Sequence, residues 1–190
     1  MRHFLASVLL LFLVTLLGGC LSPRAESPAE KRSVINYMSQ TTLTDLYRQR
    51  PSARENISRS DGYAVFSNIN AQYLFIGGSG GYGVVVDKAT GKKTYMKMAQ
   101  VDLGLGFGLQ DIRVVFVFHS PAALDSFINS GWEFGGRADL AARAEDRGAS
   151  ATGAVSISPE IDMYTLTKSG LIAKVNLSGS KYWKDEQLNQ

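Results

Sequence analysis

The stretch IRVVFVFHSPAALDSFINSG, residues 112–131, decides the fold. Its first seven residues, 112–118, are apolar except for one arginine, which is typical of a central β-strand covered on both faces. Ser120 and Pro121 then favour the start of a helix, because serine caps the first turn and proline fits it. An apolar stripe follows, and Gly131 is placed to end the helix. The stretch therefore predicts a buried strand followed directly by a helix.

Short apolar runs broken by glycines extend on both sides of this stretch, from residue 62 to residue 177. Such runs predict antiparallel strands, which we place at 62–66, 73–76, 84–86, 94–98, 164–167 and 171–177. Residues 87–92 form a hairpin turn in which Gly91 is free to take a positive φ. Lys168, Ser169 and Gly170 form a second turn.

Ahead of the strands, residues 30–50 have helical periodicity. The spacing breaks between Met38 and Leu43, so both a kinked helix and two short helices fit it. Pro51 ends the helical segment, and residues 52–58 allow another turn or two. The predicted fold class is therefore α+β: a curled antiparallel sheet, barrel- or sandwich-like, with amino-terminal helices and one helix inserted midway.

The amino terminus predicts the compartment. Residues 4–17 are an almost unbroken apolar run, shorter than the roughly 20 residues of a membrane span and suited to a signal peptide. Leu17-Gly18-Gly19-Cys20 resembles the lipobox of bacterial lipoproteins. The resemblance implies removal of residues 1–19, diacylglycerol on the Cys20 sulfur and a fatty acyl chain, such as palmitate, on the new amino terminus. An ordinary signal peptide with a chance cysteine is the alternative.

The residues after Cys20 predict how the protein is held. Leu21 stands where an aspartate favours retention at the inner membrane, so we expect the outer membrane, with the domain facing the periplasm. Residues 20–29 contain two prolines and several small polar residues, and we expect a lipidated tether there. Residues 30–190 remain as a single domain.

The composition excludes several classes of function. Twenty basic and seventeen acidic residues give a net charge of +3, too little for a typical nucleic-acid interface. One cysteine, Cys20, and two histidines, His3 and His119, provide neither an internal disulfide nor a Cys/His metal site. We expect no metal and no cofactor.

Two glycine patterns invite a binding interpretation. Residues 78–83, GSGGYG, match the dinucleotide fingerprint letter for letter, but a run of valines follows where a helix is needed. We interpret these glycines as sites of close backbone approach or tight sheet curvature. Gly104, Gly106 and Gly108 fall on one face of a strand. Either a packed helix or aromatic side chain, or an acyl chain, would fill that bare face.

Candidate catalytic groups are sparse. Ser120 follows His119, but it is better explained as the helix cap, and no G-x-S-x-G motif occurs. The carboxylates available for acid–base chemistry show no spacing that selects a pair: Glu133, Asp139, Glu145, Asp146 and Asp162. We predict a protein that is not an enzyme. A deep polar pocket that joined His119 to two carboxylates would reverse this prediction.

Charge is segregated along the chain. Residues 24–59 and 87–97 each carry a net charge of +3, whereas residues 98–162 carry −5. Basic residues near an anionic membrane each contribute about 1 kcal/mol to binding. The predicted headgroup contacts are Lys88, Lys92, Lys93, Lys97, Arg48, Arg50, Arg54 and Arg59. A solvated turn and helix face is the alternative explanation.

Five motifs resemble the SYLF domain, in order and over about residues 40–183. They are DGYAVFSNI (61–69), IGGSGGYGVV (76–85), LGLGFGLQ (103–110), FINSGWEFG (127–135), and KSGLIA with LSG (168–173 and 177–179). The resemblance implies lipid binding, because eukaryotic members bind phosphoinositides and some bundle actin. Bacterial members are mostly small envelope lipoproteins without an assigned enzymatic role.

The resemblance and the anchor together suggest a function. We expect a lipoprotein whose SYLF-like domain binds phospholipid headgroups, without actin, which a bacterial periplasm lacks. The alternative is an envelope scaffold or interaction protein that recognises a protein or cell-wall partner.

Overall fold

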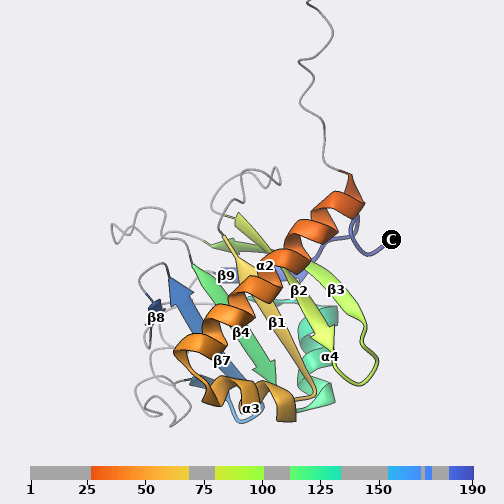
Figure 1. The fold of residues 1–190 in the computed structure, drawn as a ribbon. Helices are drawn as coiled ribbons and strands as arrows, with labels where there is room; N and C mark the ends of the chain where they lie inside the picture. Colours follow the sequence, from red (N-terminus) through yellow and green to blue (C-terminus); the bar gives the residue numbers. More distant parts are fainter. Residues whose placement is uncertain (1–26, 69–79, 101–111, 134–153, 168–169, 173–179) are drawn as a thin grey trace, which may run out of the picture.

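Nine strands pair into one curled antiparallel sheet in the computed structural model, which describes residues 27–68, 80–100, 112–133, 154–167, 170–172 and 180–190 (Figure 1). The strands are β1 (Gly62–Ser67), β2 (Gly80–Asp87), β3 (Lys93–Gln100), β4 (Arg113–Phe118), β5 (Trp132–Glu133), β6 (Val155–Ser158), β7 (Ile161–Thr167), β8 (Gly170–Ile172) and β9 (Ser180–Lys184). Their order is β5-β9-β3-β2-β1-β4-β7-β6, and β8 also pairs with β7.

Three helices occur in the described ranges: α2 (Pro28–Gln49), α3 (Ser52–Arg59) and α4 (Pro121–Ser130). Helices α2 and α3 cover one face of the sheet and α4 packs on the other (Figure 1). The α+β class, the amino-terminal helices and the helix inserted midway are thereby confirmed.

Strand β4 is central, as its apolar sequence predicted. Val114, Phe116 and Phe118 belong to the core cluster beneath α4, whereas Val115 and Val117 belong to the cluster beneath α2 and α3. Because side chains alternate along a strand, a run without polar residues must be covered on both sides. All five side chains are at most 1% exposed.

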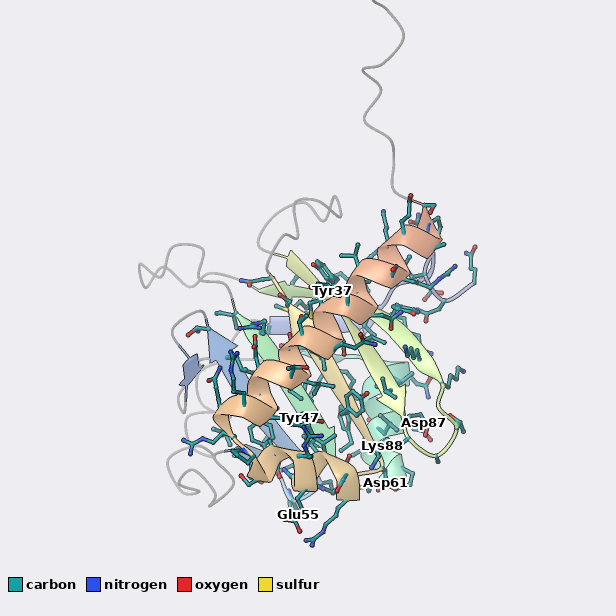
Figure 2. The ribbon with its side chains drawn as sticks, viewed as in Figure 1. Tyr37, Tyr47, Glu55, Asp61, Asp87 and Lys88 are labelled. Atoms are coloured by element: carbon teal, nitrogen blue, oxygen red, sulfur yellow. The ribbon has the colours of Figure 1, made fainter. Side chains whose placement is uncertain are left out.

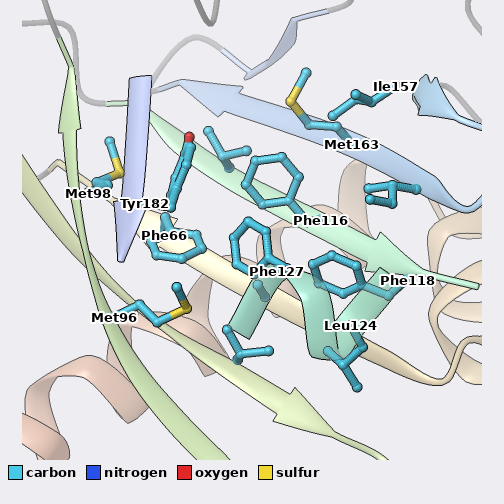
Figure 3. Packing of buried hydrophobic residues seen from close by; sticks show 14 residues of the cluster. Phe66, Met96, Met98, Phe116, Phe118, Leu124, Phe127, Ile157, Met163 and Tyr182 are labelled. Atoms are coloured by element: carbon cyan, nitrogen blue, oxygen red, sulfur yellow. The ribbon is translucent and has the colours of Figure 1, made fainter. Parts of the chain in front are cut away.

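Helix α4 begins and ends as predicted and brings an aromatic side chain into the core. Ser120 Oγ accepts a hydrogen bond from the Ala123 backbone N–H, and Gly131 follows the last turn at φ +67°. Phe127 projects from α4 into a cluster of rings (Figure 3). Its ring centroid lies 5.1–6.0 Å from those of Phe66, Phe116, Phe118, Trp132 and Tyr182. Edge and tilted contacts of this kind add to the burial of apolar area.

Helix α2 is one continuous helix, which resolves the alternatives left open by its periodicity. Its buried residues are Ile35, Ser39, Thr42 and Leu46. The spacing of four, three and four makes a single stripe, but two polar residues occupy its middle and hide the continuity in the sequence. Helical periodicity also predicts Val34 on an apolar stripe with Ile35 and Met38, but Val34 is 42% exposed. Helix α3, eight residues long, follows after Pro51 as predicted.

The helix also begins earlier than the composition indicated. Ser27 Oγ accepts from the Glu30 N–H, and the Glu30 carboxylate accepts from the Ser27 N–H, 2.7 Å away. This capping box, with Pro28 at the first helical position, starts α2 within the predicted tether. The helical region therefore includes Pro28 and Ala29, two residues more than expected.

The β2–β3 hairpin confirms both the predicted turn and the interpretation of its glycines. Gly91 has φ +71°, and the Asp87 carboxylate accepts hydrogen bonds from the N–H groups of Ala89 and Thr90. Gly81 and Gly83 lie within β2, where a Cβ would collide with backbone oxygens of β1. The fingerprint glycines described here therefore permit close strand approach rather than opening a helix.

Where β9 no longer pairs with β3, two groups cover the edge of β3 at Tyr95: the Asn189 side chain, and the Asp185 backbone N–H, which donates to the Tyr95 carbonyl at 3.0 Å. Strand β9 pairs with β3 only from Met96 onward. At Tyr95 the Asn189 amide replaces it, because Asn189 Oδ1 accepts from the Tyr95 N–H at 2.9 Å and Nδ2 donates to the Tyr95 carbonyl at 2.7 Å. The amide thus satisfies the same backbone groups that a neighbouring strand would use.

Several predictions lie outside the described residues. These are the signal peptide, Cys20, the strand at 73–76, the stripe of Gly104, Gly106 and Gly108, and the part of the strand at 171–177 beyond Ile172. Within the described range, β7 and β8 pair antiparallel through Thr165↔Ile172, in agreement with the predicted hairpin.

Candidate functional site

The structure divides the predicted basic residues into groups by the contacts that each makes. Lys88 is the most heavily bonded. Its ammonium donates to three backbone carbonyls at the carboxyl end of α3: Ile57 at 2.9 Å, Ser58 at 2.5 Å and Ser60 at 2.7 Å. An ammonium has three donors, so all of them are used within the chain. Its positive charge also complements the negative end of the helix dipole. Figure 2 shows Lys88 near Asp61, below the β2–β3 hairpin.

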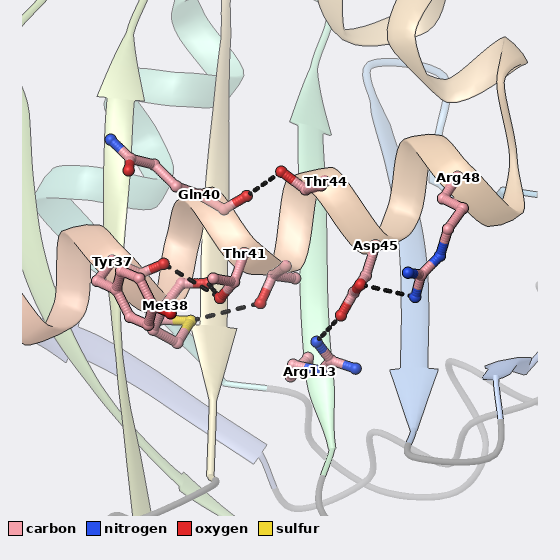
Figure 4. A network of polar contacts seen from close by, with 9 residues as sticks. Tyr37, Met38, Gln40, Thr41, Thr44, Asp45, Arg48 and Arg113 are labelled. Carbon is pink, nitrogen blue, oxygen red and sulfur yellow. Dashed lines mark hydrogen bonds and ion pairs between the residues drawn. The ribbon is translucent and has the colours of Figure 1, made fainter.

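Three further predicted cations are ion-paired. Arg48 pairs with Asp45 at 2.9 Å, Arg59 pairs with Glu55, and Lys97 pairs with Asp185 at 3.3 Å. The Asp45 carboxylate also binds Arg113 of β4 at 2.7 Å, so it lies between two arginines (Figure 4). This arrangement fixes α2 to the start of β4. It also leaves Arg48 with a neutralising partner.

The last two predicted arginines lie around the α2–α3 junction. Arg54 stacks over the Tyr47 ring, 4.5 Å from its centroid, a contact that holds a guanidinium close to the surface. Burial raises the pKa of the Tyr47 hydroxyl, and nearby Tyr63 adds to the rise. Arg50 is exposed at the end of α2. This group of arginines lies at the opposite end of α2 from its capped amino terminus (Figure 1).

Lys92 and Lys93 converge with two cations that the sequence did not single out. Together with Arg32 of α2 and Lys184 of β9, they line one pocket of about 650 Å³. Lys93 Nζ donates to Asn36 Oδ1 at 2.9 Å, Arg32 Nη1 to the Leu188 carbonyl at 3.2 Å, and Lys184 Nζ to Asn129 Oδ1 at 2.9 Å. The pocket thus brings together residues more than 150 positions apart.

No local signal in the sequence could have found Arg32 and Lys184. Lys184 reaches the pocket through the pairing of Met96 with Lys184 between β3 and β9, which joins distant segments. Arg32 reaches it because α2 packs beside the chain segment that follows β9. Both placements depend on tertiary structure.

Asp87 also lines the pocket, but its carboxylate is hydrogen-bonded within the β2–β3 turn. Its carboxylate accepts from the Thr90 hydroxyl at 2.6 Å and from two backbone N–H groups. The Thr90 hydroxyl bond is the main cause that lowers the pKa of Asp87. Two other carboxylates of the lining, Asp125 of α4 and Glu186, are exposed.

Among the candidate catalytic side chains that the structure describes, His119 lies beside one carboxylate, that of Asp162. His119 Nε2 lies 3.0 Å from Asp162 Oδ2, and Asn56 of α3 donates to the same oxygen. Ser120 serves as the α4 cap. Of the remaining carboxylates, Asp139, Glu145 and Asp146 lie outside the described residues. Within the described ranges, no group of three His, Cys, Asp or Glu side chains could hold a metal ion.

The outer face of α2 exposes apolar surface. Tyr37 is 70% exposed and Val34 is 42% exposed. Tyr37 points outward from the helix (Figure 2) and adjoins Asn36, the residue that holds Lys93. None of the helices in the described part of the chain has the length and apolar character needed to span a bilayer.

These features define a class: an α+β domain with a curled sheet, a polar basic pocket and an exposed aromatic helix face. Residues 99–190 match the family described as Ysc84, Las17-binding protein actin regulator. The chain is also 35% identical over 161 residues to beta cell expansion factor A of Aeromonas veronii. The chain belongs to the SYLF (Ysc84) family, as its motifs predicted.

The matched region covers 85% of this chain and 60% of the Aeromonas protein. The chain therefore spans less than two thirds of the length of that relative. The family match covers residues 99–190, which include β4 to β9 and α4.

Proposed function

We propose that the chain is a lipid-anchored, non-enzymatic protein of the bacterial outer membrane that faces the periplasm and binds phospholipid headgroups. The single observation that carries the proposal is Tyr37, which is 70% exposed on the outer face of α2. A tyrosine ring is suited to the boundary between headgroups and acyl chains, because one end is apolar and the other is polar.

Basic side chains of the β2–β3 hairpin support the same function. Lys93 is held by Asn36, the neighbour of Tyr37 along α2, and Lys92 precedes it in the exposed turn. Each such cation near an anionic surface adds about 1 kcal/mol to binding. The lipobox at Cys20 would keep the domain close to the bilayer, since two or three acyl chains anchor a protein stably.

The test is co-sedimentation of the chain from Leu21 onward with phosphatidylglycerol or cardiolipin vesicles, at low and high salt. We expect binding at low salt that weakens as salt screens the charges. Tyr37→Ser should weaken binding, whereas Tyr37→Phe, the matched control, should retain it. Absence of binding at low salt would contradict the proposal.

The same exposed face favours a second candidate function, an envelope interaction protein. An aromatic side chain flanked by polar residues is also typical of a protein interface. The two functions are separable, because a protein partner would still be captured after Lys92 and Lys93 were changed to serine, without vesicle binding. If Tyr37→Ser lost both vesicle binding and capture of the protein partner, both kinds of ligand would use this face of α2.

A further inference from the structure

The pocket shared by α2, the β2–β3 hairpin, α4 and the segment after β9 is lined by side chains of both signs. Its cations are Arg32, Lys92, Lys93 and Lys184, and its carboxylates include Asp125 and Glu186. A volume of about 650 Å³ falls within the range of roughly 300–1,000 Å³ in which proteins hold small molecules.

Three cations of the pocket, Arg32, Lys93 and Lys184, donate to neutral acceptors. Arg32 and Lys184 are half-buried, and their partners are the Leu188 carbonyl and the Asn129 amide oxygen. The ion pairs among the described residues involve other cations: Arg48, Arg59, Lys97, Arg113 and His119. Neutral partners fix the direction of a cation and leave its charge available to an anion.

The cations and the carboxylates of the pocket come from different elements. Arg32 on α2 and Lys184 on β9 are half-buried, whereas Lys92 and Lys93, around the start of β3, are exposed. Asp125 on α4 and Glu186 after β9 are exposed as well. Asp87 adds a further negative charge, since its lowered pKa favours the charged carboxylate and Lys92 interacts with it. The pocket therefore offers both signs of charge to a ligand.

From this lining of both signs we infer that the pocket binds a zwitterionic phosphate ligand, with a phosphoethanolamine group as its defining chemistry. The phosphate oxygens would accept hydrogen bonds from Arg32 and Lys184, with Lys92 and Lys93 beside them. The protonated amine would face Asp125 and Glu186. A ligand carrying phosphate alone would leave the two carboxylates unmatched and repelled.

The inference rests on the proposed function, since it names the headgroup that one site of the domain recognises. The pocket and the Tyr37 face differ in location and in the charge of the ligand that each would prefer. The Tyr37 face would contact an anionic bilayer surface, whereas the pocket would select one headgroup that carries both charges. Phosphoethanolamine occurs both in lipid and as a free molecule, and the experiment separates these sources.

The test is calorimetric titration of the full chain in detergent with three probes: dihexanoyl phosphatidylethanolamine, free phosphoethanolamine and glycerol phosphate. We expect saturable binding of the first, and weaker binding of glycerol phosphate. Lys184→Gln should weaken binding of the phosphatidylethanolamine probe about ten-fold, because one hydrogen bond to a charged group is lost. Lys92→Gln serves as a second variant, because its exposed side chain leaves folding unaffected.

Asp125→Asn is the most informative variant. It should weaken binding of the ethanolamine probes and leave glycerol phosphate unchanged or tighter, because only the amine loses a partner. Arg59→Gln is the matched control: it removes an exposed, ion-paired cation outside the pocket and should change none of the affinities. Binding of the lipid probe alone would identify a lipid headgroup, and equal binding of free phosphoethanolamine would identify the free molecule as a sufficient ligand.

Two results would overturn the inference: no saturable binding of either ethanolamine probe, or equal effects of Asp125→Asn on all three probes. If vesicle binding through Tyr37 persists when either result is found, the inference about the pocket is refuted and the surface proposal is not. If the ethanolamine probes bind but vesicles do not, the pocket stands and the surface proposal fails.

Discussion

Lys88 and Lys93 lie on the two sides of one hairpin, and both are exposed, yet their surroundings differ. Lys88 donates to three backbone carbonyls of α3 and its exit, at 2.5–2.9 Å. Lys93 donates to one side-chain oxygen, Asn36 Oδ1, at 2.9 Å. By exposure alone the two lysines would be given the same role, and the sequence analysis predicts both as headgroup contacts.

The difference shows that the number and rigidity of the acceptors determine what an exposed lysine does. Backbone carbonyls at a helix end are fixed in place and need donors, so Lys88 stabilises the fold. The Lys93 ammonium donates to one side-chain oxygen, that of Asn36, and an ammonium has three donors. Lys93 can therefore also meet an external anion. The following predictions test this contrast, beginning with the largest effect.

Lys88→Met should destabilise the domain most. The substitution keeps the apolar stem and removes three charge-assisted hydrogen bonds, which leaves carbonyls of α3 without their donor. We expect a loss of about 1.5–3 kcal/mol in the free energy of unfolding, equivalent to several degrees in Tm. Thermal and urea unfolding would measure it. An unchanged Tm would contradict the structural role of Lys88.

Asp87→Asn should have a smaller effect that depends on pH. Hydrogen bonds from Thr90 and the turn lower the pKa of Asp87 in the folded state. A lowered pKa contributes stability above the unfolded value of about 3.9 and loses it as the pH falls through the folded value. The variant should therefore melt lower than the wild type at pH 7, and the two Tm values should converge in acid. A constant difference across this range would exclude the charge as the cause.

Lys93→Met should change stability least. It removes one exposed contact, so the free energy of unfolding should stay within about 0.5 kcal/mol of the wild type. Binding to anionic vesicles at low salt should nevertheless fall, whereas folded Lys88→Met should bind nearly as well as the wild type. The reverse ranking of the two variants in binding would refute the division between structural and ligand-facing lysines.

Local chemistry explains which parts of the fold could be predicted. The Ser120 cap, Gly131 at the helix end, Gly91 in the turn and the two-sided burial of β4 each follow from neighbouring residues. The capping box of Ser27 and Glu30 was equally visible in the sequence, but the adjacent proline was interpreted as part of a tether.

The site was less predictable because its members meet only in the tertiary structure. The charge segregation indicated the hairpin and the helical region, and Lys92 and Lys93 of that hairpin line the pocket. It could not indicate that Lys88 caps α3, about 30 residues earlier, or that Lys184 enters the pocket across a strand pair. Contacts over such separations have no periodic signal in one sequence.

The amide of Asn189 has a consequence for how the molecule behaves at high concentration. Two hydrogen bonds to Tyr95 occupy the backbone groups beyond the end of β9, where an unpaired edge would accept a strand from another copy. The Asp185 backbone N–H also donates to the Tyr95 carbonyl, so one side chain and one backbone group cover this edge together. Loss of the Asn189 amide would leave the Tyr95 N–H open to pairing with a strand of another copy. The segment after β9 therefore contributes to the resistance of this fold to edge-to-edge assembly.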